Sequence, residues 1–224
     1  MKLWGLFASC FAIHVLADWM TSYGTPVFAP FSFKNYSLDL VSNLSFGPMA
    51  ILSVFILLSL RFKEDSKKWI LGGWIAFFAF VGSASYGQNK AFGLVGEDTL
   101  ASLPDLILPT RWYVVKRGAQ DPAVETYSVS VWSREKRFIG RYPLMSSLND
   151  RFLLRAVQLP RVRRSLWFNR WPVARVKEQG PETVIEIGNI LFRWLKGGAL
   201  GGWIVRMDRD GNLVSLRRGA FKPE

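Results

Sequence analysis

The chain has 224 residues, half of them hydrophobic, with 29 Lys and Arg against 17 Asp and Glu and a formal net charge of +12. Ten tryptophans and a mean hydropathy of +0.13 exclude an ordinary small soluble domain. The composition predicts a membrane portion joined to a basic, water-facing portion. The single cysteine, Cys10, excludes an intramolecular disulfide and a zinc site built from several cysteines.

Three apolar stretches lie in the first 88 residues, at about 3–19, 40–60 and 69–87, and the second and third contain no charged residue. A helix needs about 20 such residues to cross a hydrocarbon core of ~30 Å, so the first stretch is at the lower limit. Its apolar character continues past Cys10, which favours an uncleaved helix over a lipoprotein signal peptide. We predict a membrane protein with three transmembrane helices in residues 1–88.

The segment between the second and third stretches, residues 61–68, contains four basic residues. Short basic loops stay in the cytoplasm, so this loop is predicted to be cytoplasmic. Residues 20–39, and the chain after about residue 88, then lie outside. The predicted protein is therefore multi-pass, with its C-terminal domain outside the cytoplasm.

Residues 89–110 contain two glycines and two prolines as breakers and predict a juxtamembrane connector, with one short helix at about 97–103. Residues 111–224 predict a β-rich, α+β domain in water. A helix at 148–159, with Ser147 as its N-cap and Pro160 as its stop, would pack on the sheet. Asp210-Gly211 predicts a hairpin turn. The predicted strands are 112–116, 127–132, 137–142, 172–177, 183–187, 203–208 and 213–217.

The only histidine, His14, stands four residues before Asp18 inside the first apolar stretch. At helical spacing the two side chains share one face. Ionisable side chains in a membrane helix are costly and usually functional. The pair is either half of a site for a divalent metal such as zinc or an intramembrane hydrogen bond that fixes helix packing. Catalytic zinc needs about three protein ligands, and Asp39 could supply a third oxygen.

Three further polar residues, Thr21, Tyr23 and Thr25, surround Gly24 in the turn that follows this stretch. Their hydroxyls could bind a substrate and orient its phosphate. The alternative is a plain interfacial loop.

From residue 104 onward the chain holds 22 of the 29 basic residues and 11 of the 17 acidic ones. Arg161-Val-Arg-Arg164 with Trp167 and Trp171 has the composition of a nucleic-acid surface. The predicted location outside the cytoplasm argues against that partner. We expect membrane lipid, and no nucleic acid, as the partner of the basic domain.

The opening motif resembles that of a known family. His14-x-x-x-Asp18-x-x-Thr21-x-Tyr23-Gly24-Thr25, continued by Ala29-Pro30-Phe31-Ser32 and Tyr36-Ser37-Leu38-Asp39, is similar to the last motif of the YdjM-like family. These are LexA-regulated inner-membrane proteins described as metal-dependent hydrolases, some of them phospholipase-like, so the resemblance implies a location in a bacterial inner (cytoplasmic) membrane. The resemblance implies that His14 and Asp18 are metal ligands, with Asp39 as a helper and Tyr23 and Thr21 shaping the site.

Members of that family usually begin with further helices that carry additional metal ligands, including a His-Arg-Gly-x-Thr-His type motif. The present sequence starts where those helices end. Three explanations stay open: a start codon assigned too far downstream, a partner subunit or second copy that completes the site, or a non-catalytic member.

Two functional hypotheses follow. The first is an inner-membrane, metal-dependent hydrolase that uses metal-activated water on an ester or phosphoester bond. The second is a non-catalytic, membrane-anchored interaction or envelope-structure protein with a basic outer domain.

Overall fold

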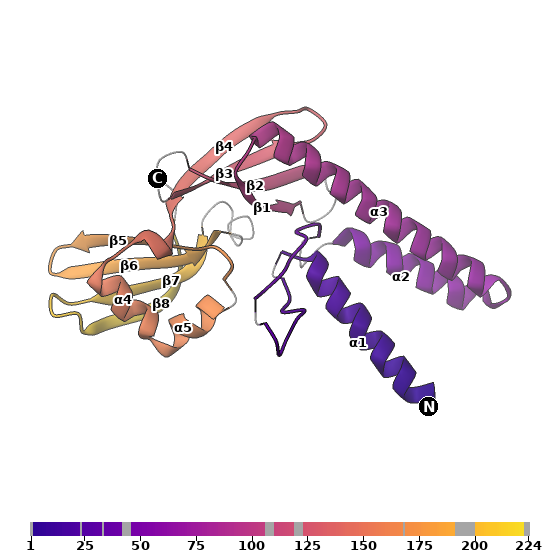
Figure 1. The fold of residues 1–224 in the computed structure, drawn as a ribbon, viewed down its shortest axis with the longest axis horizontal. Coiled ribbons are helices and arrows are strands. Elements are labelled where there is room, and N and C mark those ends of the chain that lie inside the picture. Colours follow the sequence, from indigo (N-terminus) through magenta and orange to yellow (C-terminus); the bar gives the residue numbers. More distant parts are fainter. Residues whose placement is uncertain are drawn as a thin grey trace. The chain divides into compact units, whose positions relative to one another are not determined.

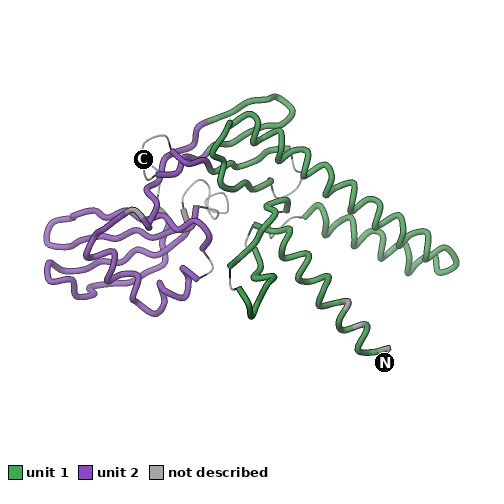
Figure 2. Tube along the Cα trace, viewed as in Figure 1, with its two compact units in different colours: residues 1–115, 127–137 green, residues 116–126, 138–224 purple. Residues whose placement is uncertain are grey.

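A computed structural model describes residues 2–22, 24–32, 34–41, 46–105, 110–118, 123–167, 169–190 and 200–221. The chain forms two compact units (Figure 2). The first unit comprises residues 1–115 and 127–137, and the second comprises residues 116–126 and 138–224. A helical N-terminal region and a β-rich remainder with two sheets agree with the predicted fold class.

Three α-helices occupy the first unit: α1 (Lys2–Met20), α2 (Phe46–Arg61) and α3 (Ser66–Val95) (Figure 1). A short 3-10 helix, η1 (Lys63–Asp65), joins α2 to α3. Two segments of the described chain are long and apolar enough to cross a membrane, Leu3–Met20 and Lys63–Val95.

The predicted number of three full-length spans is therefore corrected to two, because the helix expected at 40–60 is shorter. α2 begins at Phe46 and has 16 residues, which at about 1.5 Å per residue is ~24 Å. Upstream, the amides of Leu40 and Val41 donate to the carbonyl of Met20 at 3.0 and 3.1 Å, so this part of the apolar stretch is a loop bonded to the end of α1. Pro48 lies in the first turn of α2, where a proline is tolerated.

Helices α2 and α3 pack closely through small residues. A Cβ added to Gly72 or Gly73 would lie 2.9 Å from the Phe55 side chain, so only glycine at both positions leaves room for this ring. Close approach over small residues is the usual way in which membrane helices associate. The Phe55 ring also lies 6.4 Å from the Trp69 ring.

The end of α3 packs on the first sheet, whose strand order is β1 (Thr99–Pro104), β2 (Arg111–Arg117), β3 (Ala123–Ser130), β4 (Lys136–Pro143). Ala84, Ala91 and Val95 of α3 form one buried cluster with Trp112, Val114 and Val129 of the sheet. The small alanines let the helix approach the strands. The sheet is thereby attached directly to the helix that is long enough to span the membrane.

The short helix predicted at 97–103 is wrong, because residues 99–104 form strand β1 instead. α3 continues to Val95, Gly96 ends it, and Asp98 then takes a φ of 66°, which turns the chain. Burial of Ala101, Ser102 and Leu103 as an edge strand outweighs the local helix preference of this segment.

The second unit contains an antiparallel sheet in the order β5 (Pro172–Gln179), β6 (Glu182–Asn189), β7 (Leu200–Met207), β8 (Leu213–Phe221). The four strands predicted at 172–177, 183–187, 203–208 and 213–217 are confirmed, and consecutive strands pair antiparallel. Its core consists of buried residues from the strands and from two short helices. These are Leu153, Ala156, Val162, Ala174, Ile185, Ile187, Val205 and Met207.

The two short helices are α4 (Arg151–Gln158) and α5 (Pro160–Trp167). Asp150, and not the predicted Ser147, caps α4: its Oδ1 accepts from the amides of Phe152 and Leu153 at 2.8 and 2.9 Å. Pro160, predicted as a stop, ends α4 but also begins α5. Proline has no amide hydrogen to lose at a first helical position, and its fixed φ suits a helix start.

The predicted turn at Asp210-Gly211 connects β7 to β8. The Asp208 carboxylate accepts hydrogen bonds from the Asn212 side chain at 3.0 Å and from its amide at 2.8 Å. The side-chain bond is the stronger influence, and together they hold the pKa of Asp208 below its ordinary value.

Candidate functional site

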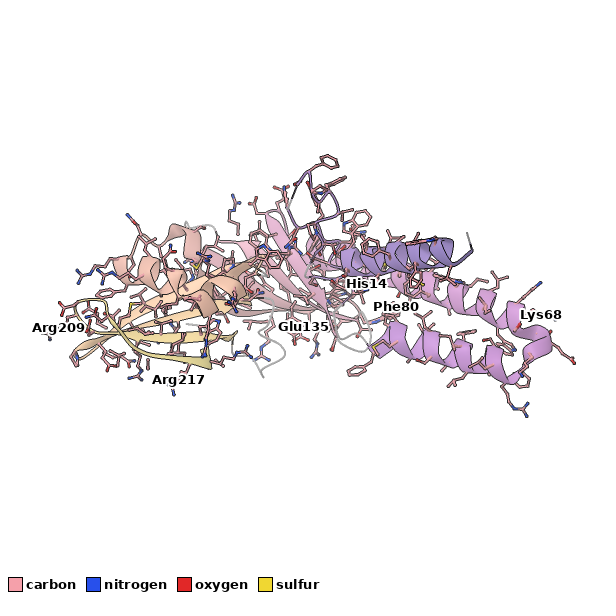
Figure 3. All side chains as sticks on the ribbon, turned by 90° about the horizontal axis from the view of Figure 1, so that it is seen from below. His14, Lys68, Phe80, Glu135, Arg209 and Arg217 are labelled. Atoms are coloured by element: carbon pink, nitrogen blue, oxygen red, sulfur yellow. The ribbon has the colours of Figure 1, made fainter. Side chains whose placement is uncertain are left out.

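The His14/Asp18 pair lies on one face of α1, as predicted. His14 Nε2 is 3.5 Å from Asp18 Oδ2, and the two side chains are 73% and 50% exposed. No described residue of Leu3–Met20 is buried. Figure 3 labels His14 on this helix. The pair is therefore presented outward from an otherwise apolar helix.

The loop after α1 folds back on the end of this helix. The amide of Leu38 donates to the carbonyl of Trp19 at 2.9 Å, and Thr25 and Tyr36 exchange backbone hydrogen bonds at 2.9 and 3.0 Å. Gly24 has a φ of 74° beside this pairing, a conformation that favours glycine. We call residues 21–41 the α1 loop. Its bonds hold the described motif residues close to the C-terminal end of α1.

Asp39 is buried within the α1 loop, upstream of α2, which begins at Phe46. The Ser37 hydroxyl lies 2.5 Å from Asp39 Oδ1 and also contacts the carbonyl of Thr21. In return the amide of Asp39 donates to Ser37 Oγ at 3.1 Å. Asp39 thus takes part in fixing the loop.

The fit of these residues to a metal ion is partial. Two ligands bound at about 2.0–2.1 Å to one tetrahedral zinc ion lie about 3.3–3.4 Å apart, close to the 3.5 Å between His14 and Asp18. However, the described residues contain no group of three or more His, Cys, Asp or Glu placed to hold a metal. Asp39 is not brought into such a group with the pair. The described part of the chain offers two ligands of a site that needs about three.

The three residues predicted to bind substrate have different positions. The Thr21 hydroxyl donates to the carbonyl of Asp18 at 2.7 Å and so satisfies the end of α1. The Thr25 hydroxyl is buried and has no hydrogen-bond partner among the residues that the structure describes. Tyr23 lies outside the described residues. A buried hydroxyl without a partner is uncommon, so Thr25 is the exception among the described residues of the α1 loop that were predicted to bind substrate.

Gln88, which sequence reasoning missed, connects three parts of the first unit. Its Nε2 donates to the carbonyl of Leu38 at 2.9 Å and to Ser102 Oγ at 3.0 Å. It therefore joins α3, the α1 loop and strand β1. The sequence does contain one sign of this role: Gln88 is a long amide side chain at the end of an uncharged apolar run. A polar group buried in such a place needs a hydrogen-bond partner.

A second candidate site lies in the second unit, in a groove between α5 and β8. We call it the arginine groove, because Arg161, Arg164, Arg217 and Arg218 line it. It has a volume of about 650 Å³, and Trp203 lies in its wall. The Trp203 indole donates to Ser165 Oγ at 2.9 Å, and the Arg218 guanidinium lies 5.5 Å from the Trp203 ring.

A neighbouring hollow of about 440 Å³ shares Ser165, Trp203 and Arg218 with the arginine groove and extends it along β7 and β8. The sequence predicted a basic surface here but not its shape, because the four arginines come from segments about 55 residues apart.

Comparison with known families found a match in the N-terminal region. The model of the family described as YdjM inner membrane protein matches residues 1–91. Residues 1–91 are therefore similar to a YdjM inner membrane protein. The YdjM match covers α1, the α1 loop, α2 and most of α3, and it confirms the family resemblance seen in the opening motif. No curated protein and no solved structure matches the chain. The inner membrane is thus the location indicated by both the YdjM match and the two long apolar segments.

Proposed function

We propose that the chain is part of an inner-membrane, metal-dependent hydrolase in which His14 and Asp18 provide two ligands of a divalent metal, with zinc as the first candidate. The proposal rests on the His14/Asp18 pair, whose side chains lie 3.5 Å apart and are exposed on an apolar helix. Charged groups in a membrane face other helices or a water-filled cavity rather than lipid. The remaining ligands would then come from another helix that packs against α1, in a partner subunit or in a second copy of the chain.

A metal held there would supply Lewis-acid chemistry for hydrolysis of an ester or phosphoester bond. The chain's own contribution is to position groups at the end of α1. Thr25, with its buried hydroxyl, would donate to a substrate oxygen, while Thr21 and Tyr23 would shape the same turn. Asp39 and Ser37 would keep the loop in place.

The proposed orientation rests on the turn between α2 and α3. Arg61, Lys63, Lys67 and Lys68 lie in or next to this turn, which favours the cytoplasmic side. Figure 3 labels Lys68 there. With α3 crossing the membrane, both sheets would lie outside the cytoplasm.

Metal content tests the hydrolase proposal. Protein is extracted from its native membrane in a mild detergent, so that partners stay bound, and bound metal is measured by mass spectrometry. Wild type is expected to hold a stoichiometric divalent metal. His14→Ala and Asp18→Asn are each expected to lower the affinity for the metal by about 100-fold or more. Loss of a residue that only hydrogen-bonds to a metal ligand already lowers metal affinity by about 10–100-fold.

Cys10→Ala, one turn earlier on α1, serves as the control and should retain the metal. The proposal fails if wild type holds no metal, or if the His14→Ala protein holds it as tightly as wild type.

A second candidate function is favoured by the arginine groove: a membrane-anchored protein that binds an acidic, extended polypeptide segment. None of the four groove arginines pairs with a carboxylate among the described residues. Among the described strands, β8 is the edge strand of its sheet and has a neighbour on one side only. Exposed edges accept an added strand through backbone hydrogen bonds, and the arginines would select for acidic side chains.

Adjacent positions on α5 provide a matched test of this groove. Arg164 lines it, whereas Arg163 does not. With a fluorescent ten-residue glutamate peptide as the probe, Arg164→Glu is expected to weaken binding by about tenfold through like-charge repulsion, and Arg163→Glu much less. Equal losses for the two variants would mean that net charge alone, and not the groove, attracts the peptide.

A further inference from the structure

The length of the uncharged part of α3 sets the level of the membrane boundary. Between Lys68 and Lys90 the chain has 21 residues without a charge. As a helix they span ~31 Å, which matches a hydrocarbon core of ~30 Å. Lys68 and Lys90 then lie at opposite boundaries, and Tyr86, one turn before Lys90, lies about 6 Å inside the outer boundary, next to the upper acyl carbons.

At this level the first unit has a cleft of about 860 Å³. One wall is a single face of α3, made by Ser83, Tyr86, Lys90 and Gly93, which follow one another at helical spacing. The opposite wall comes from residues next to β2 and from the turn between β3 and β4. Its members are Thr110, Val131, Trp132 and Arg134.

Two cations and two aromatic rings are the chemically distinctive groups of this cleft. Tyr86 is 61% exposed and Trp132 is 82% exposed, values unusual for such large rings in a water-facing fold. Tyrosine and tryptophan are enriched where a protein meets the headgroup layer. Lys90 Nζ lies 5.6 Å from the centre of the Tyr86 ring.

The positive charges of the cleft are available to a ligand. Neither Lys90 nor Arg134 forms an ion pair among the described residues. The nearest carboxylate in sequence, Glu135, does not line the cleft; its backbone carbonyl accepts from the amide of Ser130 at 2.9 Å. The cleft therefore carries two net positive charges beside apolar rings.

We infer that this cleft binds the headgroup of an anionic phospholipid. The lipid phosphate accepts hydrogen bonds from the Lys90 ammonium and the Arg134 guanidinium, and the glycerol and upper acyl carbons lie against Tyr86 and Trp132. A free phosphate shares the charge but not the apolar part, so the rings distinguish a lipid from the ion. The site lies in a different place from the His14/Asp18 pair and does not depend on the proposed hydrolase activity.

Binding of a short-chain lipid tests this inference. Dioctanoyl phosphatidylglycerol is titrated into the detergent-solubilised full chain and followed by calorimetry. We expect one saturable site and at least about tenfold weaker binding of dioctanoyl phosphatidylcholine. Lys90→Ala/Arg134→Ala should weaken phosphatidylglycerol binding by about tenfold or more. The matched control, Lys63→Ala/Lys67→Ala, removes the same charge at the other end of α3 and should leave the affinity unchanged.

Gly93 allows the cleft to be blocked without removing charge. A Cβ added to Gly93 would meet no atom within 4 Å, so a larger side chain at this position enters the cleft. Gly93→Leu should lower lipid affinity by about tenfold, while Gly93→Ala should not, and circular dichroism checks that both variants fold.

Three outcomes would overturn the assignment. The first is wild-type affinity in the Lys90→Ala/Arg134→Ala protein, and the second is equal affinity for phosphatidylcholine and phosphatidylglycerol. The third is displacement of the lipid by an equal concentration of inorganic phosphate, which would mean that the site recognises the ion alone.

Discussion

Replacement of Trp112 by alanine is expected to lower the apparent melting temperature of the detergent-solubilised chain by about 10 °C. Trp112 is fully buried in strand β2, where it packs in one cluster with Ala84, Ala91 and Val95 of α3. Loss of a buried tryptophan costs about 3–5 kcal/mol, and each kcal/mol is worth about 2–4 °C in a chain of this size. Circular dichroism of the strand signal during heating measures the change.

Trp132→Ala provides the matched control, because this ring belongs to the turn that follows β3 and is 82% exposed. Its loss should shift the melting temperature by less than about 2 °C. If both variants melted at the same temperature, the contact between α3 and the first sheet would not be the main source of stability there. A Trp112→Phe protein should lie between wild type and Trp112→Ala.

The second large effect is expected for Gly24→Ala, which should open the α1 loop. An alanine with a φ near 74° costs about 1–2 kcal/mol, and its Cβ would lie 2.8 Å from the carbonyl oxygen of Tyr36. That oxygen accepts from the amide of Thr25, so relief of the clash breaks this bond. We expect the Thr25 and Tyr36 amides to exchange with deuterium at least about tenfold faster.

Exchange measured by mass spectrometry on peptides from residues 24–41 checks this expectation. Gly93→Ala, where no neighbouring atom is close, is the control and should not accelerate exchange anywhere in the loop. Unchanged exchange in the Gly24→Ala protein would show that the Thr25–Tyr36 pairing does not depend on the backbone conformation at Gly24.

Local sequence was sufficient where a single physical rule acted. The 3.6-residue repeat placed His14 beside Asp18, and alternation with a turn at Asp210-Gly211 identified the last hairpin. The local sequence was misleading where one residue type satisfies two different rules. Pro160 was expected only to stop a helix, yet the same ring geometry starts the next one.

Longer-range features were not predictable from local patterns. The stretch beginning at Leu40 is apolar enough to be a membrane span, but backbone bonds to Met20 take its first residues into a loop. The local sequence of residues 99–103 favours a helix, but these residues form a strand because they pair with the neighbouring strand β2. The cleft at Lys90 and Arg134 joins residues more than 40 positions apart, which no local pattern reveals.

The hydrogen bonds of Gln88 have a consequence for the order in which the chain is completed during synthesis. The α1 loop is made early, but the amide that holds its Leu38 carbonyl is made 50 residues later, and Ser102, which fixes the same amide, follows after another 14. At translation rates of about 5–20 residues per second, Gln88 is synthesised several seconds after the α1 loop that it bonds. The region around the His14/Asp18 pair therefore reaches its final form only after α3 is in place and the first sheet has begun to form.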